Sequence, residues 1–328
     1  MLATKRPTES MEKVMNPAAP RKKWQIVDGV LMLDKPGGMT SNGALQAARR
    51  LHSAAKAGHT GTLDPMATGL LPVLFGEATK FSHMLLDADK TYRATLCLGI
   101  NTSTADAEGE VIRERDVTCS EADIHAACAR FLGAIEQVPP MYSALKHQGR
   151  ALYDYARQGV EIEREARAVT IHELAIERVD LGDVPEVVIR VRCSKGTYIR
   201  TLAEDIGEVL GCGAHLTALR RLATGPLSLE SAVTLEALGE MEEGARVARL
   251  LAPDSLLAHL PRLTLDGALE ARFSHGNAVS CAGMAAVPRG EVRVYGTVFM
   301  GLGRVDDDGM LRAIRLVSTL HPGEAADI

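Results

Sequence analysis

A run of twelve residues, from Gly58 to Gly69, brings together several groups that could do chemistry. It contains one carboxylate (Asp64), one imidazole (His59), three threonine hydroxyls and three glycines. An ionised carboxylate can act as a nucleophile or as a base. Pro65 disfavours helical backbone angles at the residue before it, so we expect a stiff turn to present Asp64. The run would also suit an ordinary polar loop, and its spacing matches no Walker A, Rossmann or EF-hand motif.

The segments that flank this run are expected to hold it in place. Residues 30–33 form a short apolar run, typical of a buried strand, which ends at the turn-forming residues 34–38. We expect Ser41 to cap a helix that continues to about Leu51, because apolar residues then recur on one helical face. Residues 56–69, rich in Gly, Thr and Pro, are expected to form a loop.

Two segments with alternating side chains predict half-buried strands. The alternation runs over residues 91–100 and again over residues 187–194. A serine at the start of residues 120–132 predicts a capped helix there. A second helix is predicted over residues 202–210, where apolar residues follow helical spacing and Gly211 provides a typical end.

Composition divides the chain into parts. Residues 1–25 are basic and poor in apolar side chains, which indicates a disordered tail. Residues 26–255 are expected to form the main domain. Within it, residues 137–165 form a polar excursion with a short helix near 150–158. Glycine-punctuated apolar runs over residues 256–328 predict a small all-β domain.

The overall composition is that of a globular protein with an acidic balance. Of 328 residues, 46% are hydrophobic and 24% charged, and the formal net charge is −5. No apolar stretch is long enough for a membrane helix, and no secretory signal is evident, so we expect a cytoplasmic protein. Six scattered cysteines without a C-x-x-C pair favour structural thiols over disulfides or a metal site. Residues 1–60 nevertheless hold 10 Lys and Arg against 4 Asp and Glu.

Several longer motifs, in one order over nearly all of residues 27–225, resemble those of the TruB family of pseudouridine synthases. Besides the run from Gly58 to Gly69, they are the segments DKPGGMTS at 34–41, GEATKF at 76–81, DKTYR at 89–93, PMYSALK at 140–146, CSKGTYIR at 193–200 and LRRL at 219–222. The resemblance implies an α/β fold of the α+β type, with a mixed, largely antiparallel sheet flanked by helices. The segment FSHGNAV at 273–279 weakly resembles a PUA-like RNA-binding domain.

The resemblance also implies the activity. The family isomerises uridine 55 in the T loop of tRNA to pseudouridine, so tRNA is the expected partner through its T arm. The reaction breaks the N1–C1′ bond, turns the freed uracil and rejoins it through C5. It involves no redox change and consumes no water, so we expect neither a cofactor nor a metal. A monomer that works without a guide RNA or a membrane is expected.

Residue by residue, the resemblance assigns the catalytic aspartate to Asp64, the stacking tyrosine to Tyr92 and the arginine paired with the aspartate to Arg200. Further substrate-binding positions are expected at His59, Tyr198, Gly61, Thr62, Lys35, Lys80, Lys146, Arg150 and Leu219. The chain departs from the family pattern at Ser103, where an aspartate is common, but keeps the second acidic position at Asp106. The departure puts a supporting polar contact in doubt.

The physical chemistry of these side chains agrees with the assignment. An arginine can hold a carboxylate bidentately and does not lose its own proton. An aromatic ring holds the face of a base without fixing its in-plane rotation, and stacking contributes about 1–3 kcal/mol per base. Tyr92 could equally be a core tyrosine, and both descriptions hold if its ring lies at the rim of the core. Basic and aromatic residues interleaved over 137–165 are typical of RNA-loop recognition.

Three alternative functions stay open on the residues alone. An RNA chaperone could refold tRNA without the chemistry, or alongside it. A guide-RNA-dependent enzyme acting on ribosomal RNA is disfavoured by the excursion over 137–165, which direct loop recognition requires. A glycosidase would need two catalytic carboxylates. Because positive charge is only local, we expect RNA binding to depend shallowly on salt.

Overall fold

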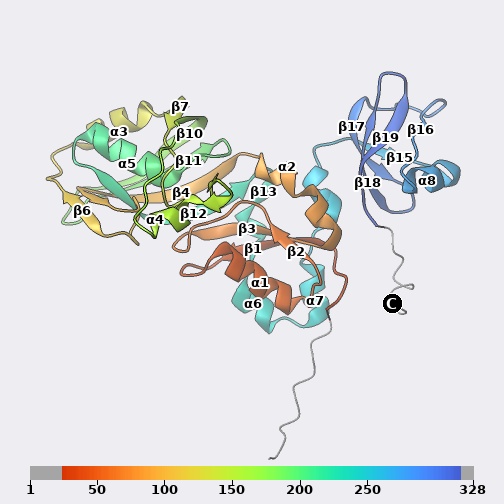
Figure 1. Ribbon diagram of the computed structural model, residues 1–328, viewed down its shortest axis with the longest axis horizontal. Coiled ribbons are helices and arrows are strands. Elements are labelled where there is room, and N and C mark those ends of the chain that lie inside the picture. The colour runs from red at the N-terminus through yellow and green to blue at the C-terminus, as the bar shows by residue number, and fades with distance from the viewer. Residues whose placement is uncertain (1–23, 319–328) are drawn as a thin grey trace, which may run out of the picture.

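The computed structural model of the protein (Figure 1) describes residues 24–318. The predicted basic tail therefore lies outside the described residues, except for its last two members. Trp24 lies beneath the Arg49 guanidinium, 4.4 Å from the ring centroid. The Gln25 amide nitrogen donates to the Ser53 carbonyl oxygen at 2.7 Å.

A ten-stranded mixed sheet forms the main part of the chain. Eight strands follow one path, in the order β14 (Val233–Thr234), β1 (Gly29–Lys35), β3 (Thr68–Phe75), β12 (Ala214–Thr224), β4 (Lys90–Leu98), β11 (Glu186–Cys193), β10 (Arg167–Asp180) and β7 (Gly133–Gln137). Strand β2 (Ala57–His59) pairs with β3, and β13 (Leu227–Ser228) pairs with β12. Only the β1–β14 and β3–β12 pairs in this sheet are parallel. The predicted mixed, largely antiparallel sheet is confirmed.

Helices cover this sheet at several places (Figure 1). They are α1 (Ser41–Leu51), α2 (Ser82–Leu86), α3 (Glu121–Ala129), α5 (Ile199–Leu210), α6 (Leu235–Glu240) and α7 (Glu243–Ala248), with short 3₁₀ turns η1 (Gly76–Phe81), η2 (Leu229–Ser231) and η3 (Pro253–Leu257). Helix α5 packs its Leu202 and Ile206 against Leu96 of β4 and Ile189 of β11. No helix among residues 24–318 is long and apolar enough to cross a membrane.

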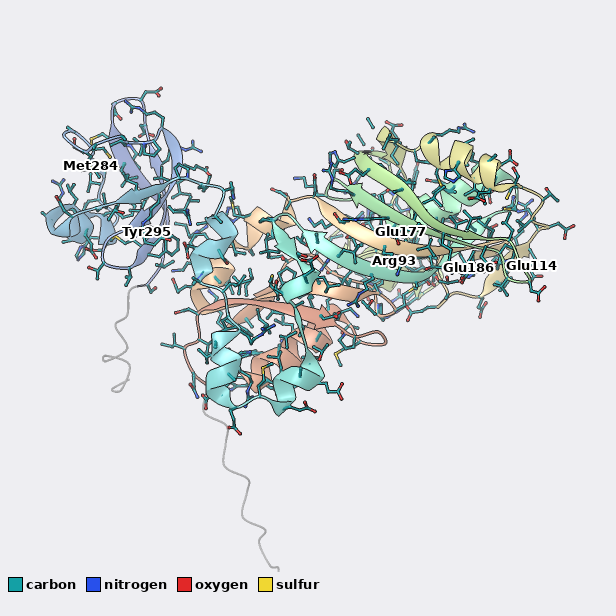
Figure 2. All side chains as sticks on the ribbon, turned by 180° about the vertical axis from the view of Figure 1, so that it is seen from behind. Arg93, Glu114, Glu177, Glu186, Met284 and Tyr295 are labelled. Carbon is teal, nitrogen blue, oxygen red and sulfur yellow. The ribbon has the colours of Figure 1, made fainter. Side chains whose placement is uncertain are left out.

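The other face of strands β4 and β11 meets solvent and is covered with ion pairs. Arg93 pairs with Glu177 at 2.6 Å, and Arg192 pairs with Glu173 at 3.0 Å. Figure 2 shows Arg93 and Glu177 together on this side of the sheet. The predicted alternation therefore separates a packed face from a charged one, as expected for half-buried strands.

Two small hairpins project from the main sheet. Strands β5 (Ile100–Thr102) and β6 (Val111–Glu114) form one, and β8 (Lys146–His147) with β9 (Arg150–Ala151) forms the other. The second hairpin continues into helix α4 (Leu152–Ala156). This hairpin and helix lie within the predicted excursion, and α4 agrees with the short helix expected near residues 150–158.

A second, five-stranded sheet lies at the C-terminal end of the described chain (Figure 1). Its order is β15 (Arg262–Thr264), β17 (Gly290–Tyr295), β18 (Phe299–Val305), β19 (Met310–Leu316) and β16 (Val279–Ser280). Its core includes Phe273 from helix α8 (Gly267–Ser274), which Asp266 caps. The segment is expected from its sequence to be all-β, but it also contains helix α8. This helix is held against the sheet because its one aromatic residue, Phe273, is buried in the core.

Several predicted boundaries also differ from the structure. Thr40, not Ser41, caps α1, because its hydroxyl accepts from the Gly43 amide. The expected loop over 56–69 begins with strand β2 and ends where β3 starts. Ser120 caps α3, as predicted, and forms a full capping box with Asp123, but that helix stops at Ala129 rather than near Leu132. These differences are small, because a local sequence pattern predicts the presence of a helix or strand better than its first and last residues.

The short parallel pairing of β3 with β12 requires a glycine. Gly69 has φ +100°, and a Cβ there would overlap the Arg221 carbonyl oxygen. Gly133 has a similar φ of +95°, but a Cβ there would meet nothing within 4 Å.

We expect Gly69→Ala to lower the free energy of unfolding by about 2 kcal/mol more than Gly133→Ala. Both variants carry the cost of a positive φ, about 1–2 kcal/mol, but only the first also forces a strand apart. Urea denaturation of the two variants measures the difference. Equal losses would show that the strand crossing tolerates a side chain.

Candidate active site

Asp64 lies on a turn that is fixed on both sides. The hydroxyl of Ser41, in the first turn of α1, accepts from the Leu63 amide at 2.8 Å and lies 3.0 Å from the Leu63 carbonyl oxygen. The ammonium of Lys35, at the end of β1, donates to the Pro65 carbonyl oxygen at 3.2 Å. The residues before and after the acid are therefore held by two different elements, which preorganises the carboxylate.

A single buried arginine holds the Asp64 carboxylate. Arg200 is the second residue of α5, and its side chain is 6% exposed. Its Nε lies 3.0 Å from Asp64 Oδ2, and its Nη2 donates to the Tyr142 carbonyl oxygen at 2.7 Å. Its Nη1 donates to the Thr104 carbonyl oxygen at 3.2 Å and lies 3.5 Å from Asp106 Oδ2. The Arg200 guanidinium thus contacts groups from three separate loops.

Asp106, the retained acidic position, is the more deeply buried of the two carboxylates. Its side chain is 4% exposed, against 36% for Asp64. It accepts from the Thr104 hydroxyl at 2.5 Å and from the Glu108 amide at 3.1 Å. Ser103, where the family pattern has an aspartate, accepts instead from the Glu110 amide at 3.1 Å. The Ser103 hydroxyl thus connects the two ends of the loop between residues 103 and 110.

Burial raises the pKa of the Asp64 carboxyl above its ordinary value, and the neighbouring Asp106 raises that pKa further. The Arg200 guanidinium and the Lys35 ammonium act in the opposite direction and favour the ionised form. A partly desolvated carboxylate is a better nucleophile and base than a fully hydrated one, provided that a cation keeps it ionised.

Next to this ion pair is a cavity of about 280 Å³. It is lined by Thr62, Leu63, Asp64, Tyr92, Ala144, Thr197, Tyr198, Ile199, Arg200 and Leu219. The Tyr92 ring also packs against the core beneath α5, so it lies at the rim of that core, as the sequence suggested. Leu219 on β12 pairs with Ala94, two residues beyond Tyr92 on β4. An aromatic ring, a leucine and a carboxylate are a suitable lining for a flat base.

Sequence reasoning gave no role to Arg221, the most completely buried arginine among the described residues. It is 1% exposed and pairs across the sheet with Tyr92. Its Nε donates to the Leu70 carbonyl oxygen at 2.7 Å and its Nη2 to the Gly61 carbonyl oxygen at 3.0 Å. Burial raises the pKa of the Tyr92 phenol, and Arg221 partly opposes this. Arg221 alternates in phase with Leu219, which was the available signal for an inward position.

A second cavity, of about 470 Å³, also borders Asp64. Its lining includes His59, Thr62, Asp106, Tyr153 and Arg157. His59 Nδ1 is buried with no hydrogen-bond partner among residues 24–318. Burial and the nearby Arg221 lower the pKa of His59, so its imidazole is neutral at pH 7. Such an imidazole can accept or donate a hydrogen bond to a ligand that enters this cavity.

Gly61, within the same turn, has φ +80°, and a Cβ there would lie 3.2 Å from Arg221 Nη1. Tyr198, at the start of α5, is fixed by its main chain. Its amide donates to Gln137 Oε1 at 3.0 Å, and its carbonyl accepts from Gln137 Nε2 at 3.2 Å. Tyr198 lines the cavity beside the ion pair, whereas Gly61 belongs to the turn that carries Thr62 and is in the lining of neither cavity.

Other predicted binding residues lie elsewhere or are already engaged. The Lys35 ammonium is buried against the carbonyl oxygens of residues 36, 39 and 65. Lys80 pairs with Glu77 at 2.6 Å and donates to the Leu316 carbonyl oxygen at 2.9 Å. Lys35 thus supports the turn that carries Asp64, and Lys80 connects η1 to strand β19 of the C-terminal sheet.

The hairpin residues Lys146 and Arg150 differ in their contacts with the rest of the chain. Arg150 lies over the Tyr155 ring, 4.8 Å from its centroid, and donates to the Asp154 carbonyl oxygen at 2.9 Å. Lys146 is exposed on β8. Neither lines the two cavities beside Asp64.

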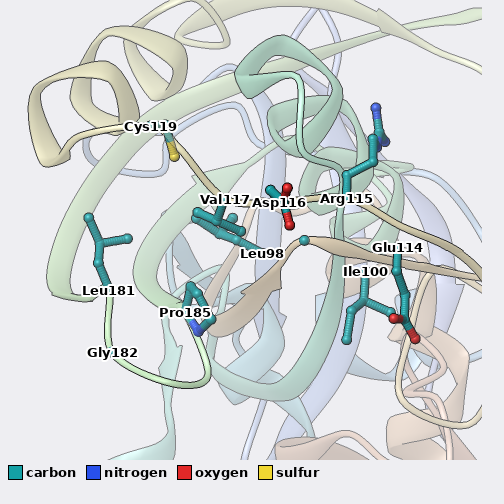
Figure 3. Close-up of a pocket in the computed structure, with 11 residues that line it drawn as sticks. Leu98, Ile100, Glu114, Arg115, Asp116, Val117, Cys119, Leu181, Gly182 and Pro185 are labelled. Carbon is teal, nitrogen blue, oxygen red and sulfur yellow. The ribbon is translucent and has the colours of Figure 1, made fainter.

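A larger cavity, of about 570 Å³, lies at the far end of β4 (Figure 3). Its charged groups are Glu114, Arg115 and Asp116. The Arg115 guanidinium is engaged by both carboxylate oxygens of Glu208 and by Asn101 at 2.7 Å. No convergent set of reactive groups is left there. Within residues 24–318, no group of three or more His, Cys, Asp or Glu side chains could hold a metal ion.

Family models match most of the chain. The TruB family pseudouridylate synthase N-terminal domain matches residues 49–199. The tRNA pseudouridylate synthase B C-terminal domain matches residues 200–257, and the C-terminal domain of pseudouridine synthase II TruB matches residues 261–317.

Curated relatives and solved structures agree with these matches. A tRNA pseudouridine synthase B from Burkholderia mallei is 56% identical over 306 residues, covering 92% of this chain and 97% of the relative. One from Aromatoleum aromaticum is 56% identical over 301 residues, with 92% and 96% covered. A chain in a crystal structure of a Cbf5–Nop10–Gar1 complex is similar with a TM-score of 0.66, 27% identity, and 89% and 85% covered.

We expect Asp106→Asn to lower the pKa of the Asp64 carboxyl. The substitution removes a negative charge beside Asp64 and leaves the Arg200 guanidinium to a single carboxylate. Titration of ¹³C-labelled aspartate by NMR measures the change. Glu173→Gln, which neutralises an exposed carboxylate on β10, is the control and should leave the titration unchanged. An unchanged or raised Asp64 pKa in Asp106→Asn would contradict this electrostatic description.

Proposed function

The chain belongs to the TruB family of pseudouridine synthases, and from this premise we propose how its residues carry out the reaction. The activity is the isomerisation of uridine to pseudouridine in tRNA. We propose that Asp64 is the nucleophile or base, that Arg200 keeps it ionised and oriented, and that Tyr92 holds the uracil. The target we propose is uridine 55 in the T loop.

The observation that carries this proposal is the ion pair beside a cavity of the size of a base. Arg200 Nε and Asp64 Oδ2 are 3.0 Å apart, and the adjoining cavity of about 280 Å³ has Tyr92 and Leu219 in its lining. A base in this cavity therefore meets a fixed carboxylate at its sugar end. Because the target lies in a folded loop, it must first leave the stack, at a cost of a few kcal/mol.

In the reaction, the Asp64 carboxylate either attacks C1′ or removes the 2′ proton, and the N1–C1′ bond breaks with its electron pair left on the uracil. The uracil turns within the cavity, and C5 forms the new bond to C1′. In the first route the bond between C1′ and the Asp64 oxygen breaks in this step, and in the second route Asp64 returns the proton to C2′. The proton on C5 leaves and N1 takes up a proton, so atoms and charge balance without another reactant. The Tyr92 ring can hold the uracil throughout, because stacking leaves in-plane rotation free.

We propose that the second cavity, with His59 and Thr62, receives part of the distorted RNA loop. A neutral imidazole suits hydrogen bonding to a nucleotide better than proton transfer in this reaction. Residues 137–165 are proposed to contact the T arm, supported by the exposed Lys146 and by the Arg157 guanidinium, 5.3 Å from the Tyr153 ring centroid. We propose that Lys35 acts on the RNA indirectly, through the Asp64 turn.

The remaining features of the proposal concern the whole protein. We propose a catalytic domain over residues 26–255 and a PUA-like RNA-binding domain over residues 256–328. Action as a monomer without a guide RNA, and a cytoplasmic location, stay predictions. A chaperone activity on tRNA is a second prediction that the catalytic variants can separate from the chemistry.

Asp64→Asn should abolish pseudouridine formation while tRNA still binds. An amide of the same shape keeps the cavity but can neither attack C1′ nor remove a proton. Product is mapped in a T-arm minihelix incubated with the full chain, and binding is measured by filter retention. Turnover within tenfold of the wild type would overturn the role of Asp64. The absence of product with the wild-type chain, on the minihelix and on whole tRNA, would overturn the proposed function.

Arg200→Lys should lower turnover at saturating tRNA about 100-fold or more. Lysine keeps the positive charge, but a single ammonium cannot reach Asp64, Asp106 and two carbonyl oxygens in the geometry of the planar fork. Single-turnover kinetics measure the loss, with circular dichroism as the folding control. A variant with near wild-type turnover would show that charge alone is sufficient at this position.

A further inference from the structure

The segment between α4 and β10 turns one arginine toward the interior of the hairpin region. The three glutamates at alternate positions of residues 161–165 are exposed, whereas Ile162 and Arg164 are partly buried. The Arg164 side chain is 19% exposed. Its Nε and Nη1 atoms are buried and have no hydrogen-bond partner among residues 24–318. Its Nη2 lies 3.6 Å from Glu161 Oε1, beyond ordinary hydrogen-bond distance.

This arrangement is unfavourable for the protein alone. A guanidinium does not lose its proton in proteins, so Arg164 stays charged where it is buried. Buried donors normally find partners, and those that do not call for an explanation, such as a missing ligand. The two unpaired nitrogens of Arg164 are therefore an indication that an acceptor from outside the chain completes the site.

The cavity beside Arg164 has the size and charge for a small anion. Its volume is about 150 Å³, and the other basic residues in its lining are Lys146, His147 and Arg167. At about 30 Å³ for each water, this volume equals roughly five waters, enough for the five heavy atoms of a phosphate group. Two glutamates also line it, but both are exposed, so solvent screens their charge. We call this cavity the Arg164 pocket.

The Arg164 pocket is connected to the catalytic cavity through one residue of β7. Arg167 of the pocket pairs with Gln137 in the β7–β10 register. The Gln137 side chain in turn makes both hydrogen bonds to the main chain of Tyr198, which lines the catalytic cavity. A group bound in the pocket is thus linked by a short rigid path to the wall of the uridine site.

We propose that the Arg164 pocket binds one backbone phosphate of the RNA substrate. The inference rests on the proposed function, because it takes the occupant to be the RNA whose uridine enters the catalytic cavity. Arg164 supplies charge-assisted hydrogen bonds from its unpaired nitrogens, and Lys146 and Arg167 add positive charge at the mouth. The phosphate fixes the position of the RNA but reads no base.

The salt dependence of RNA binding tests this proposal. Arg164→Gln in the full chain should weaken binding of a T-arm minihelix about tenfold and reduce the slope of log K against log salt concentration by about 0.7–0.9. Arg190→Gln is the matched control, because Arg190 is exposed on β11. The control should leave the slope unchanged. An unchanged slope in Arg164→Gln, or an equal change in the control, would overturn the pocket.

A neutral substitution in the RNA identifies the contacted phosphate. Minihelices with a single methylphosphonate at each T-arm position are tested against both proteins. At one position the wild type should lose about tenfold in affinity and Arg164→Gln should lose nothing further. If no position behaves in this way, the pocket holds no backbone phosphate. Inorganic phosphate, at constant ionic strength, tests whether the pocket instead prefers the free anion. Tight binding of phosphate without the methylphosphonate effect would overturn the proposal.

Thermal stability separates a binding role from a structural one. Arg164→Met removes a partly buried charge whose nearest carboxylate oxygen is 3.6 Å away, so the free protein should melt at the same temperature or higher. A melting temperature several degrees lower would mean that Arg164 already has internal partners, against the proposal. Pseudouridine formation by the wild type is scored in the same samples. Its absence contradicts the proposed function, whereas full wild-type activity with an unchanged Arg164→Gln slope contradicts only the pocket.

Discussion

The site depends on the contacts that the Arg200 guanidinium makes. This one guanidinium contacts the Asp64 turn, the loop of Thr104 and Asp106, and the main chain of Tyr142 in the excursion. The three loops are far apart in sequence, and each ends at a different part of the fold. Because the arginine stays charged and planar, it holds all three at fixed angles. The excursion that we propose to contact RNA is thus tied through Arg200 to the carboxylate that we propose for the chemistry.

What the sequence predicts well is local. The alternation over β4 and β11, the helix cap at Ser120 and the turn at Asp64 all depend on neighbours a few residues away. What it predicts poorly depends on chain segments that meet only in the fold. Lys80 stands in one of the motifs that carry the family resemblance, yet its ammonium contacts the carbonyl oxygen of Leu316, 236 residues later. Without the topology, a lysine that donates to a distant strand cannot be distinguished from one that binds a phosphate.

Much of the positive charge of this acidic chain is already paired with groups of the chain itself. Arg93 and Arg192 are paired on the outer face of the sheet, and Arg220 is paired with Asp34 at 2.6 Å. Arg221 and Lys35 hold backbone carbonyl oxygens below the site. Few cations are therefore left for phosphates, and the shape of the cavities must contribute a large part of recognition.

The reaction requires a base that rotates inside a site that does not move. The fixed part is built from buried cations: Arg200 sets the carboxylate, and Arg221 connects the Gly61 and Leu70 carbonyl oxygens behind Tyr92. The lining of the cavity that we propose for the base is different in kind. Tyr92 and Leu219 present an aromatic face and an aliphatic side chain, which resist displacement of a ring but not its rotation. Hydrogen-bond donors around the whole ring would hold one orientation of uracil and so oppose the turn that the isomerisation needs. Rigidity outside the cavity and the contact of Tyr92 and Leu219 within it are therefore two parts of the same requirement.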